Sequence, residues 1–141
     1  MRTLMDARDQ KPKAGDSEKI TINLGYVDLG NIDLLVQEGF YANRTDLIRT
    51  AIRNQIDRHG DALRQAVTRK SVDLGLRHYS REDLEAVRDT GQTIHIRVLG
   101  LATIAQDVTP ELARATIASV AVLGALHASG AVKAALADRM R

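Results

Sequence analysis

The clearest pattern in the chain is a strict alternation of apolar and polar residues over residues 19–24. The apolar positions are Ile20, Ile22 and Leu24. The polar positions between them are Lys19, Thr21 and Asn23. Because successive side chains of a strand point to opposite faces, this alternation predicts a short strand with one buried face and one polar face. Gly25 ends the predicted strand.

Two helical patterns follow the predicted strand. Asp28 is the expected N-cap of the first helix, and Gly39 is the glycine expected to end it. Its apolar stripe consists of Leu29, Ile32, Leu35 and Val36. Asn43 is the expected N-cap of the second helix, with Asp46 three residues later in capping-box spacing. The second apolar stripe consists of Leu47, Ile48, Ala51, Ile52 and Ile56.

This strand and these helices cannot complete a fold within one chain. A single short strand has no partner, and the apolar stripes of both helices need a cover. We therefore expect a homodimer in which two chains pair their strands antiparallel and four helices close over the inner face.

Residues 18–59 resemble the ribbon-helix-helix superfamily (Arc/MetJ/CopG), and the CopG-like transcriptional regulators most closely. The resemblance rests on EKITINL in the strand, the turn glycine Gly39, and NRTDLIRTAIRNQI in the second helix. It implies that a two-stranded ribbon enters the major groove of double-stranded DNA, which such a ribbon fits. The expected function is that of a sequence-specific transcriptional regulator acting as a repressor.

The outward face of the predicted strand carries the expected base contacts. These are Lys19, Thr21 and Asn23, whose side chains can hydrogen-bond base edges. Since this face has one lysine and no arginine, we expect DNA shape and the dimer to contribute to specificity.

The start of the second helix carries the expected phosphate contacts. A helix N-terminus offers free N–H groups and the positive end of its dipole to an anion. The family resemblance places the phosphate clamp at Asn43, Arg44 and Thr45. Arg49 and Arg53 on the same helix are more typical of helix-surface ion pairs than of DNA ligands.

The second half of the chain contains an internal repeat. Gly75 and Gly100 stand 25 residues apart, Gly100 and Gly124 stand 24 apart, and each follows an apolar run. This period of strand, loop and short helix predicts a small α/β repeat domain with parallel strands. The expected helices are 80–88, 109–117 and 131–140, with Ser80 and Thr109 as caps of the first two.

The predicted fold class is therefore α+β, a ribbon-helix-helix dimerising module followed by a small α/β repeat domain of ~24-residue period. The expected divisions are a flexible N-terminal arm at 1–17, the DNA-binding module at 18–59, and a helical connector at 60–70. Residues 71–141 are expected to form an oligomerisation or partner-binding domain that joins dimers into higher assemblies, because an open sheet edge favours pairing with a second chain.

The composition narrows the remaining choices. The chain has no cysteine and therefore no disulfide or thiolate metal site. Its net charge of +2 does not by itself indicate binding to nucleic acid. His78, His95 and His127 lack close ligand spacing, so no metal and no cofactor is expected. We expect a cytoplasmic protein without a membrane segment or enzymatic activity. Two alternatives stay open: an antitoxin or plasmid-maintenance protein that captures a protein partner, and a scaffold whose repeats oligomerise.

Overall fold

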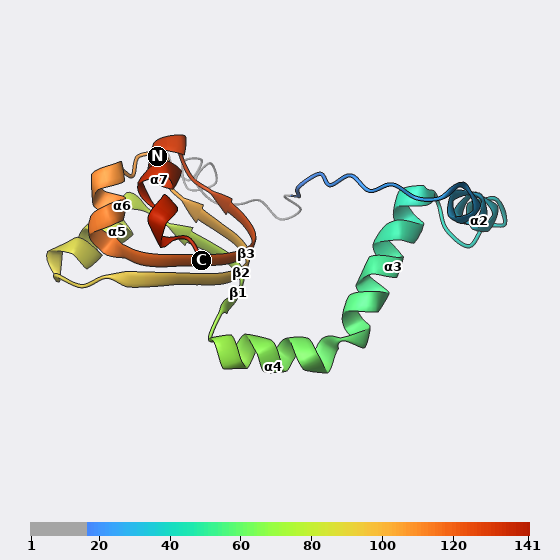
Figure 1. Ribbon diagram of the computed structural model, residues 1–141, viewed down its shortest axis with the longest axis horizontal. Helices are drawn as coiled ribbons and strands as arrows, with labels where there is room; N and C mark the ends of the chain where they lie inside the picture. Colours follow the sequence, from blue (N-terminus) through green and yellow to red (C-terminus); the bar gives the residue numbers. More distant parts are fainter. Residues whose placement is uncertain (1–16) are drawn as a thin grey trace, which may run out of the picture. The chain divides into compact units, whose positions relative to one another are not determined.

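The computed structural model describes residues 17–141, and the predicted arm lies outside the described residues except for its last position. The described chain divides into two compact units, residues 17–66 and residues 67–141. Helices and strands both contribute, so the fold class is α+β. The elements of the first unit are α2 (Tyr26–Gln37), α3 (Arg44–Arg58) and most of α4 (Gly60–Lys70), shown in Figure 1.

Residues 17–25 run into α2 without forming a strand within the single chain (Figure 1). Helix α2 begins at Tyr26, and Gly25 is its N-cap, so the prediction that Asp28 caps this helix was wrong. The carbonyl of Gly25 accepts a hydrogen bond from Leu29 N–H at 3.0 Å, which starts the helix without any side-chain cap. Asp28 lies instead in the first turn, where its negative charge is favourable beside the helix N-terminus.

Helix α2 ends just before Gly39, as the sequence pattern predicted. Gly39 has a φ of +88°, the left-handed conformation that glycine adopts without steric cost. Its N–H donates to the carbonyl of Val36, and Phe40 N–H donates to the carbonyl of Leu35, both at 3.0 Å. This pair of bonds is a Schellman motif, and it turns the chain toward α3.

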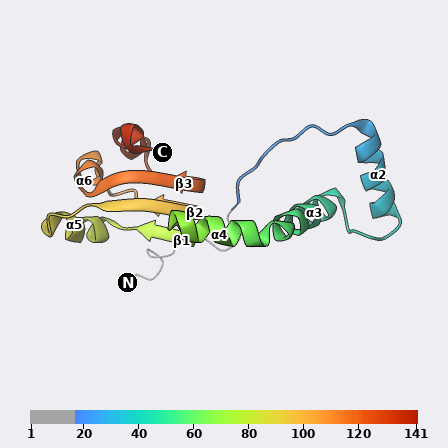
Figure 2. The ribbon, with the colours of Figure 1, turned by 60° about the horizontal axis from the view of Figure 1, so that its bottom comes forward.

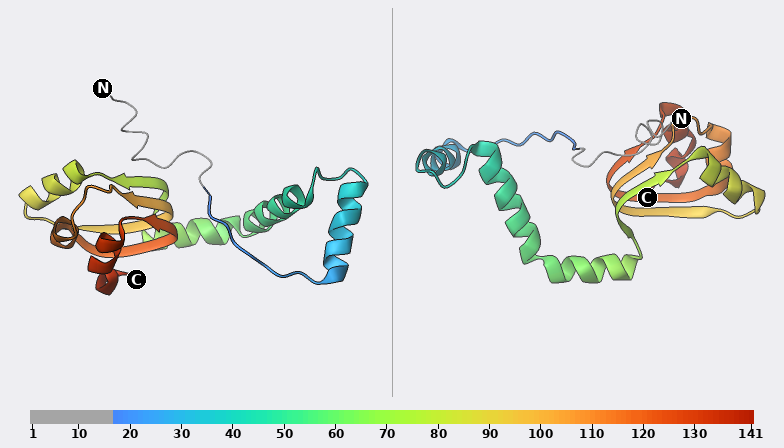
Figure 3. Two further views of the ribbon diagram at one scale, coloured as in Figure 1. Left: turned by 90° about the horizontal axis from the view of Figure 1, so that it is seen from above. Right: turned by 180° about the vertical axis from the view of Figure 1, so that it is seen from behind.

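The first unit has no fully buried side chain in any of its three helices. The stripe of α2 is only partly covered, because Leu29, Ile32 and Val36 are half-buried while Leu35 is exposed. Helices α2 and α3 pack against each other and are drawn from two sides in Figure 3. Two amphipathic helices alone do not enclose a core, so this unit leaves apolar surface open.

The second unit is built on a parallel sheet of three strands in the order β1-β2-β3. Figure 2 shows the strands side by side in chain order. Their bounds are β1 (Asp73–Tyr79), β2 (Ile94–Ile104) and β3 (Ile117–His127). Short helices connect and follow the strands, as parallel pairing requires. These are α5 (Arg81–Asp89), α6 (Pro110–Thr116), α7 (Gly130–Ala135) and the 3₁₀ turn η1 (Ala137–Arg139).

The first two of these helices begin at the caps expected from sequence. The Ser80 hydroxyl accepts from Asp83 N–H at 3.1 Å in a complete capping box, and the Thr109 hydroxyl accepts from Leu112 N–H at 3.1 Å. The continuous third helix expected at 131–140 was wrong. Helix α7 ends at Ala135, and Met140 forms a parallel bridge with Val120 of β3, which pulls the terminal residues out of helical geometry.

The core of the second unit lies between the sheet and the helices. Helix α5 packs on α6, and α6 packs on α7. The side chains that join the two layers include Leu84, Ile96, Ile104, Ile117 and Leu136, all almost fully buried. The core is almost wholly aliphatic, and Tyr79 is the aromatic residue among its described members.

A column of glycines crosses this sheet. Gly75 pairs with Gly100, and Gly100 pairs with Gly124. All three have positive φ angles, of 109°, 140° and 122°. A Cβ atom at Gly100 would come within 3.0 Å of the Gly75 carbonyl, and one at Gly124 would come as close to the Gly100 carbonyl. Only glycine allows the neighbouring backbones to approach this closely.

Candidate nucleic-acid interface

The residues predicted to contact bases lie on an exposed segment. Lys19, Thr21 and Asn23 are exposed, and so are the apolar residues that alternate with them. Ile20 is 72% exposed and Ile22 is 58% exposed. Leaving both isoleucine side chains this open forgoes stabilisation, because each fully buried aliphatic side chain contributes about 1.5–3 kcal/mol to the free energy of folding. The segment therefore has an apolar face that the described residues of the first unit leave open.

Helix α3 begins at the cap that the sequence predicts. The Asn43 side-chain oxygen accepts a hydrogen bond from Asp46 N–H at 2.8 Å. The Asp46 carboxylate accepts in return from Ala42 N–H at 2.9 Å, one residue earlier than in a standard capping box. Among the described residues, the N–H groups of Arg44 and Thr45 have no acceptor, so two donors stay available at the positive end of α3.

Arg44 holds α3 against α2. Its Nε donates to Asp33 Oδ1 at 2.7 Å, and its Nη2 donates to Asp33 Oδ2 at 2.9 Å. This hydrogen-bonded guanidinium lowers the pKa of the Asp33 carboxyl from its ordinary value. The two-pronged geometry engages one edge of the guanidinium and leaves its Nη1 donors pointing away from Asp33. Arg44 thus fixes the angle between the helices while keeping donors for a further acceptor.

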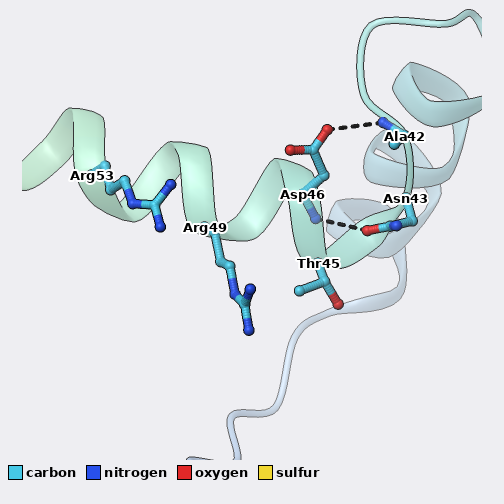
Figure 4. A pocket seen from close by; sticks show the side chains of 6 residues that line it. All are labelled: Ala42, Asn43, Thr45, Asp46, Arg49 and Arg53. Atoms are coloured by element: carbon cyan, nitrogen blue, oxygen red, sulfur yellow. Dashed lines mark hydrogen bonds between the residues drawn. The ribbon is translucent and has the colours of Figure 1, made fainter. Parts of the chain in front are cut away.

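An open pocket of about 490 Å³ lies beside the start of α3. Its lining residues, drawn in Figure 4, are Ala42, Asn43, Thr45, Asp46, Arg49 and Arg53. Thr45, Arg49 and Arg53 are spaced four residues apart, and this spacing places them along one side of the helix. The site therefore combines a helix N-terminus with two arginines, an arrangement suited to an extended anion.

The sequence did not indicate that Arg49 and Arg53 line this pocket. The sequence favoured helix-surface ion pairs for both arginines over contacts with DNA. In the described part of the chain neither arginine has an ion-pair partner. Asp46 is engaged by the backbone at the cap instead. The capping-box signal at Asn43 and Asp46 could have shown in advance that this carboxylate is occupied.

The three histidines of the second unit do not assemble a metal site. His78 Nδ1 lies 2.7 Å from Thr103 Oγ1, and His95 Nδ1 lies 2.7 Å from Ser119 Oγ. Within residues 17–141, no group of three or more side chains from histidine, aspartate or glutamate is placed to hold a metal ion. None of the described helices is long and apolar enough to cross a membrane.

Comparison with known proteins gives one result that covers most of the chain. The model of the Ribbon-Helix-Helix transcriptional regulator family matches residues 15–133. This span covers residues 17–66 and most of residues 67–141, and therefore extends well beyond the strand and the two helices that carried the resemblance in the sequence. No curated protein and no solved structure matches the chain.

Proposed function

The chain belongs to the ribbon-helix-helix transcriptional regulator family, and we propose that within this family it is a homodimeric repressor that reads DNA with residues 19–24. Two chains pair this segment antiparallel, and the resulting ribbon enters the major groove. Lys19, Thr21 and Asn23 then face the base edges. Ile20 and Ile22 face the helices of the dimer.

One observation carries this proposal: the apolar half of the alternating segment is exposed in the single chain. Ile20 and Ile22 are more exposed than not, and no side chain of α2 or α3 is fully buried. A second copy supplies what is missing, because a ribbon and four helices together enclose one core. The same pairing doubles the polar face, so that two sets of reading side chains reach adjacent base pairs.

Phosphate contacts in this proposal come from the start of α3. Asn43, Arg44 and Thr45 hold a phosphate through the free N–H groups and the Nη1 edge of Arg44. The bond from Arg44 to Asp33 keeps that edge in place. Arg49 and Arg53 extend the contact along the DNA backbone, since both line the same open pocket and neither has an ion-pair partner among the described residues.

The test is binding of the full chain to a duplex selected by the protein from a pool of randomised sequence. The double variant Lys19→Ala, Asn23→Ala should lose specific affinity, because each lost base contact costs roughly 1–3 kcal/mol, about 5- to 150-fold. Binding to unselected duplex should change much less, since most non-specific affinity comes from phosphate contacts. Fluorescence anisotropy at a fixed salt concentration measures both affinities.

Lys133→Ala is the matched control, because Lys133 is an exposed lysine on α7 of the other unit. It removes the same charge and should leave both affinities unchanged. If the double variant binds the selected duplex as tightly as this control, residues 19–24 do not read the bases and the proposal is wrong.

A further inference from the structure

The outer face of the three-stranded sheet is apolar, and the described residues of the second unit leave its edge leucines open, while Leu101 in the central strand is buried. Ile96, Val98, Ala102 and Ile104 of β2 belong to the core beneath the helices. Side chains of a strand alternate between faces, so the odd-numbered residues of β2 point to the opposite side. The paired rows on that side are Leu74–Leu99–Leu123 and Leu76–Leu101–Ala125.

The leucines of the two edge strands are the most open part of this face. Leu74 is 70% exposed, Leu76 is 56% exposed and Leu123 is 58% exposed. Leu99 in the central strand is half-buried between its neighbours. Parallel sheets occur almost only with both faces covered, because their strands are apolar on both sides. Within the described second unit, helices lie on one face of the sheet alone, so the leucine face lacks a second layer there.

Polar groups border the leucine rows along the strands. Past the rows lie His78 and Thr103, joined at 2.7 Å. Before the rows lie first Arg97, which is exposed, and then His95 and Ser119, also joined at 2.7 Å. The two histidine pairs are engaged within the chain and do not compete for a ligand. An apolar centre with a polar rim is the usual anatomy of a protein–protein interface.

The size of the face indicates what covers it. Seven paired residues at about 3.3 Å each give a length of roughly 20 Å, and three strands give a width of roughly 14 Å. Such a patch is well below the ~800 Å² per partner of a stable independent interface. A partner that binds only here would be held weakly. The occupant must therefore already be kept nearby by another contact.

We propose that the leucine face packs on the same face of the second chain of the dimer, forming a two-layered sheet. This inference rests on the proposed function, since the ribbon-helix-helix module supplies the tether. The two units of each chain are joined through α4, a single 11-residue helix, so the local concentration of the second face is high. The two leucine rows themselves carry no charge, and they are complementary to themselves across a two-fold axis.

Cysteine cross-linking of the full chain tests this pairing. The natural chain contains no cysteine, so single-cysteine variants report one position each. Leu74→Cys, Leu99→Cys and Leu123→Cys place one thiol on each strand of the same row. A residue near a two-fold axis meets its own copy, so at least one variant should form a disulfide-linked dimer under mild oxidation. Glu82→Cys, at an exposed position of α5, is the control.

The best face variant should cross-link at least about tenfold faster than the control, because pairing replaces random collision by a tethered encounter. Adding Leu76→Asp to that variant should reduce the rate to the control level. Leu76 is mostly exposed in the chain itself, so the added charge opposes pairing without emptying the core. Circular dichroism of this variant verifies that the unit stays folded.

Sedimentation and DNA binding of the same samples separate the two proposals. If the chain is dimeric and binds its selected duplex but no face variant cross-links faster than the control, the sheet pairing is wrong and the proposed function stands. If the chain is monomeric and binds no duplex, both are wrong. A dimer that binds DNA and cross-links through the face supports both.

Discussion

Replacing Gly124 by alanine tests whether the close approach of strands requires the glycine column. The new Cβ would lie under 3.0 Å from the Gly100 carbonyl oxygen and 3.0 Å from its carbonyl carbon. Both atoms belong to the backbone of the central strand, so neither can move aside as a flexible side chain could. Gly75→Ala is the matched control, because Gly75 also has positive φ but a Cβ there would meet nothing within 4 Å.

The expected loss of stability follows from separating the cost of the positive φ from the cost of the clash with the neighbouring backbone. Positive φ costs a residue with a Cβ about 1–2 kcal/mol, partly offset by the lower entropy of the unfolded chain, about 0.4–1 kcal/mol. Gly75→Ala should therefore destabilise the second unit by about 1 kcal/mol. Gly124→Ala adds the displacement of packed backbone, about 1–3 kcal/mol by analogy with overpacking, for a total of about 2–4 kcal/mol.

Thermal unfolding measures the difference between the two variants. For a unit of this size, 1 kcal/mol changes Tm by roughly 4–8 °C, so Gly124→Ala should unfold at least about 4 °C below Gly75→Ala. Amide hydrogen exchange of β2 and β3 assigns the transition to the second unit. Equal Tm values for the two variants would refute the reasoning, because the clash with the Gly100 carbonyl would then contribute nothing.

Two further predictions concern the first unit. The double variant Arg49→Ala, Arg53→Ala should weaken binding to every duplex alike and flatten the dependence of log K on log salt by about 1–2, as measured by anisotropy from low to high salt, whereas Lys133→Ala should leave the slope unchanged. An unchanged slope in the double variant would remove both arginines from the interface. Because Arg44 lowers the pKa of Asp33, the ion pair stabilises the fold above the unfolded-state pKa of about 3.9 and is lost as pH falls through the lower folded-state pKa. The Tm difference between Asp33→Asn and the natural chain should therefore shrink between about pH 6 and about pH 3, and a constant difference would contradict this role.

The parts of this fold that the sequence predicts are those decided by local chemistry. Asn43, Ser80 and Thr109 cap helices because a side-chain oxygen next to free N–H groups acts within one turn. Gly39 ends α2 for an equally local reason, its positive φ. The prediction that Asp28 caps α2 was wrong because the backbone of Gly25 starts the helix without a side-chain cap. No local residue pattern indicated that start.

The parts that the sequence did not predict depend on contacts between distant residues. Met140 leaves the expected third helix because it pairs with Val120, twenty positions earlier in the chain. The pairing of Arg44 with Asp33 across two helices was equally invisible, since the residues are not helix neighbours. The base-reading role of residues 19–24 stays a prediction, because the ribbon that we propose for them needs a strand from a second chain.

The glycine column also excludes sheets in which the strands pair in a shifted register. Strands made of valine, leucine and isoleucine can slide by two residues and still present apolar side chains to both faces, so hydrophobicity alone specifies their register weakly. A slip of β3 by one residue along β2 would press Leu123 or Ala125 against the carbonyl that Gly124 now faces. A slip by two would bring Val122 or Leu126 to the same place. The three glycines therefore specify the register of the strands, so that a repetitive sequence reaches a single alignment.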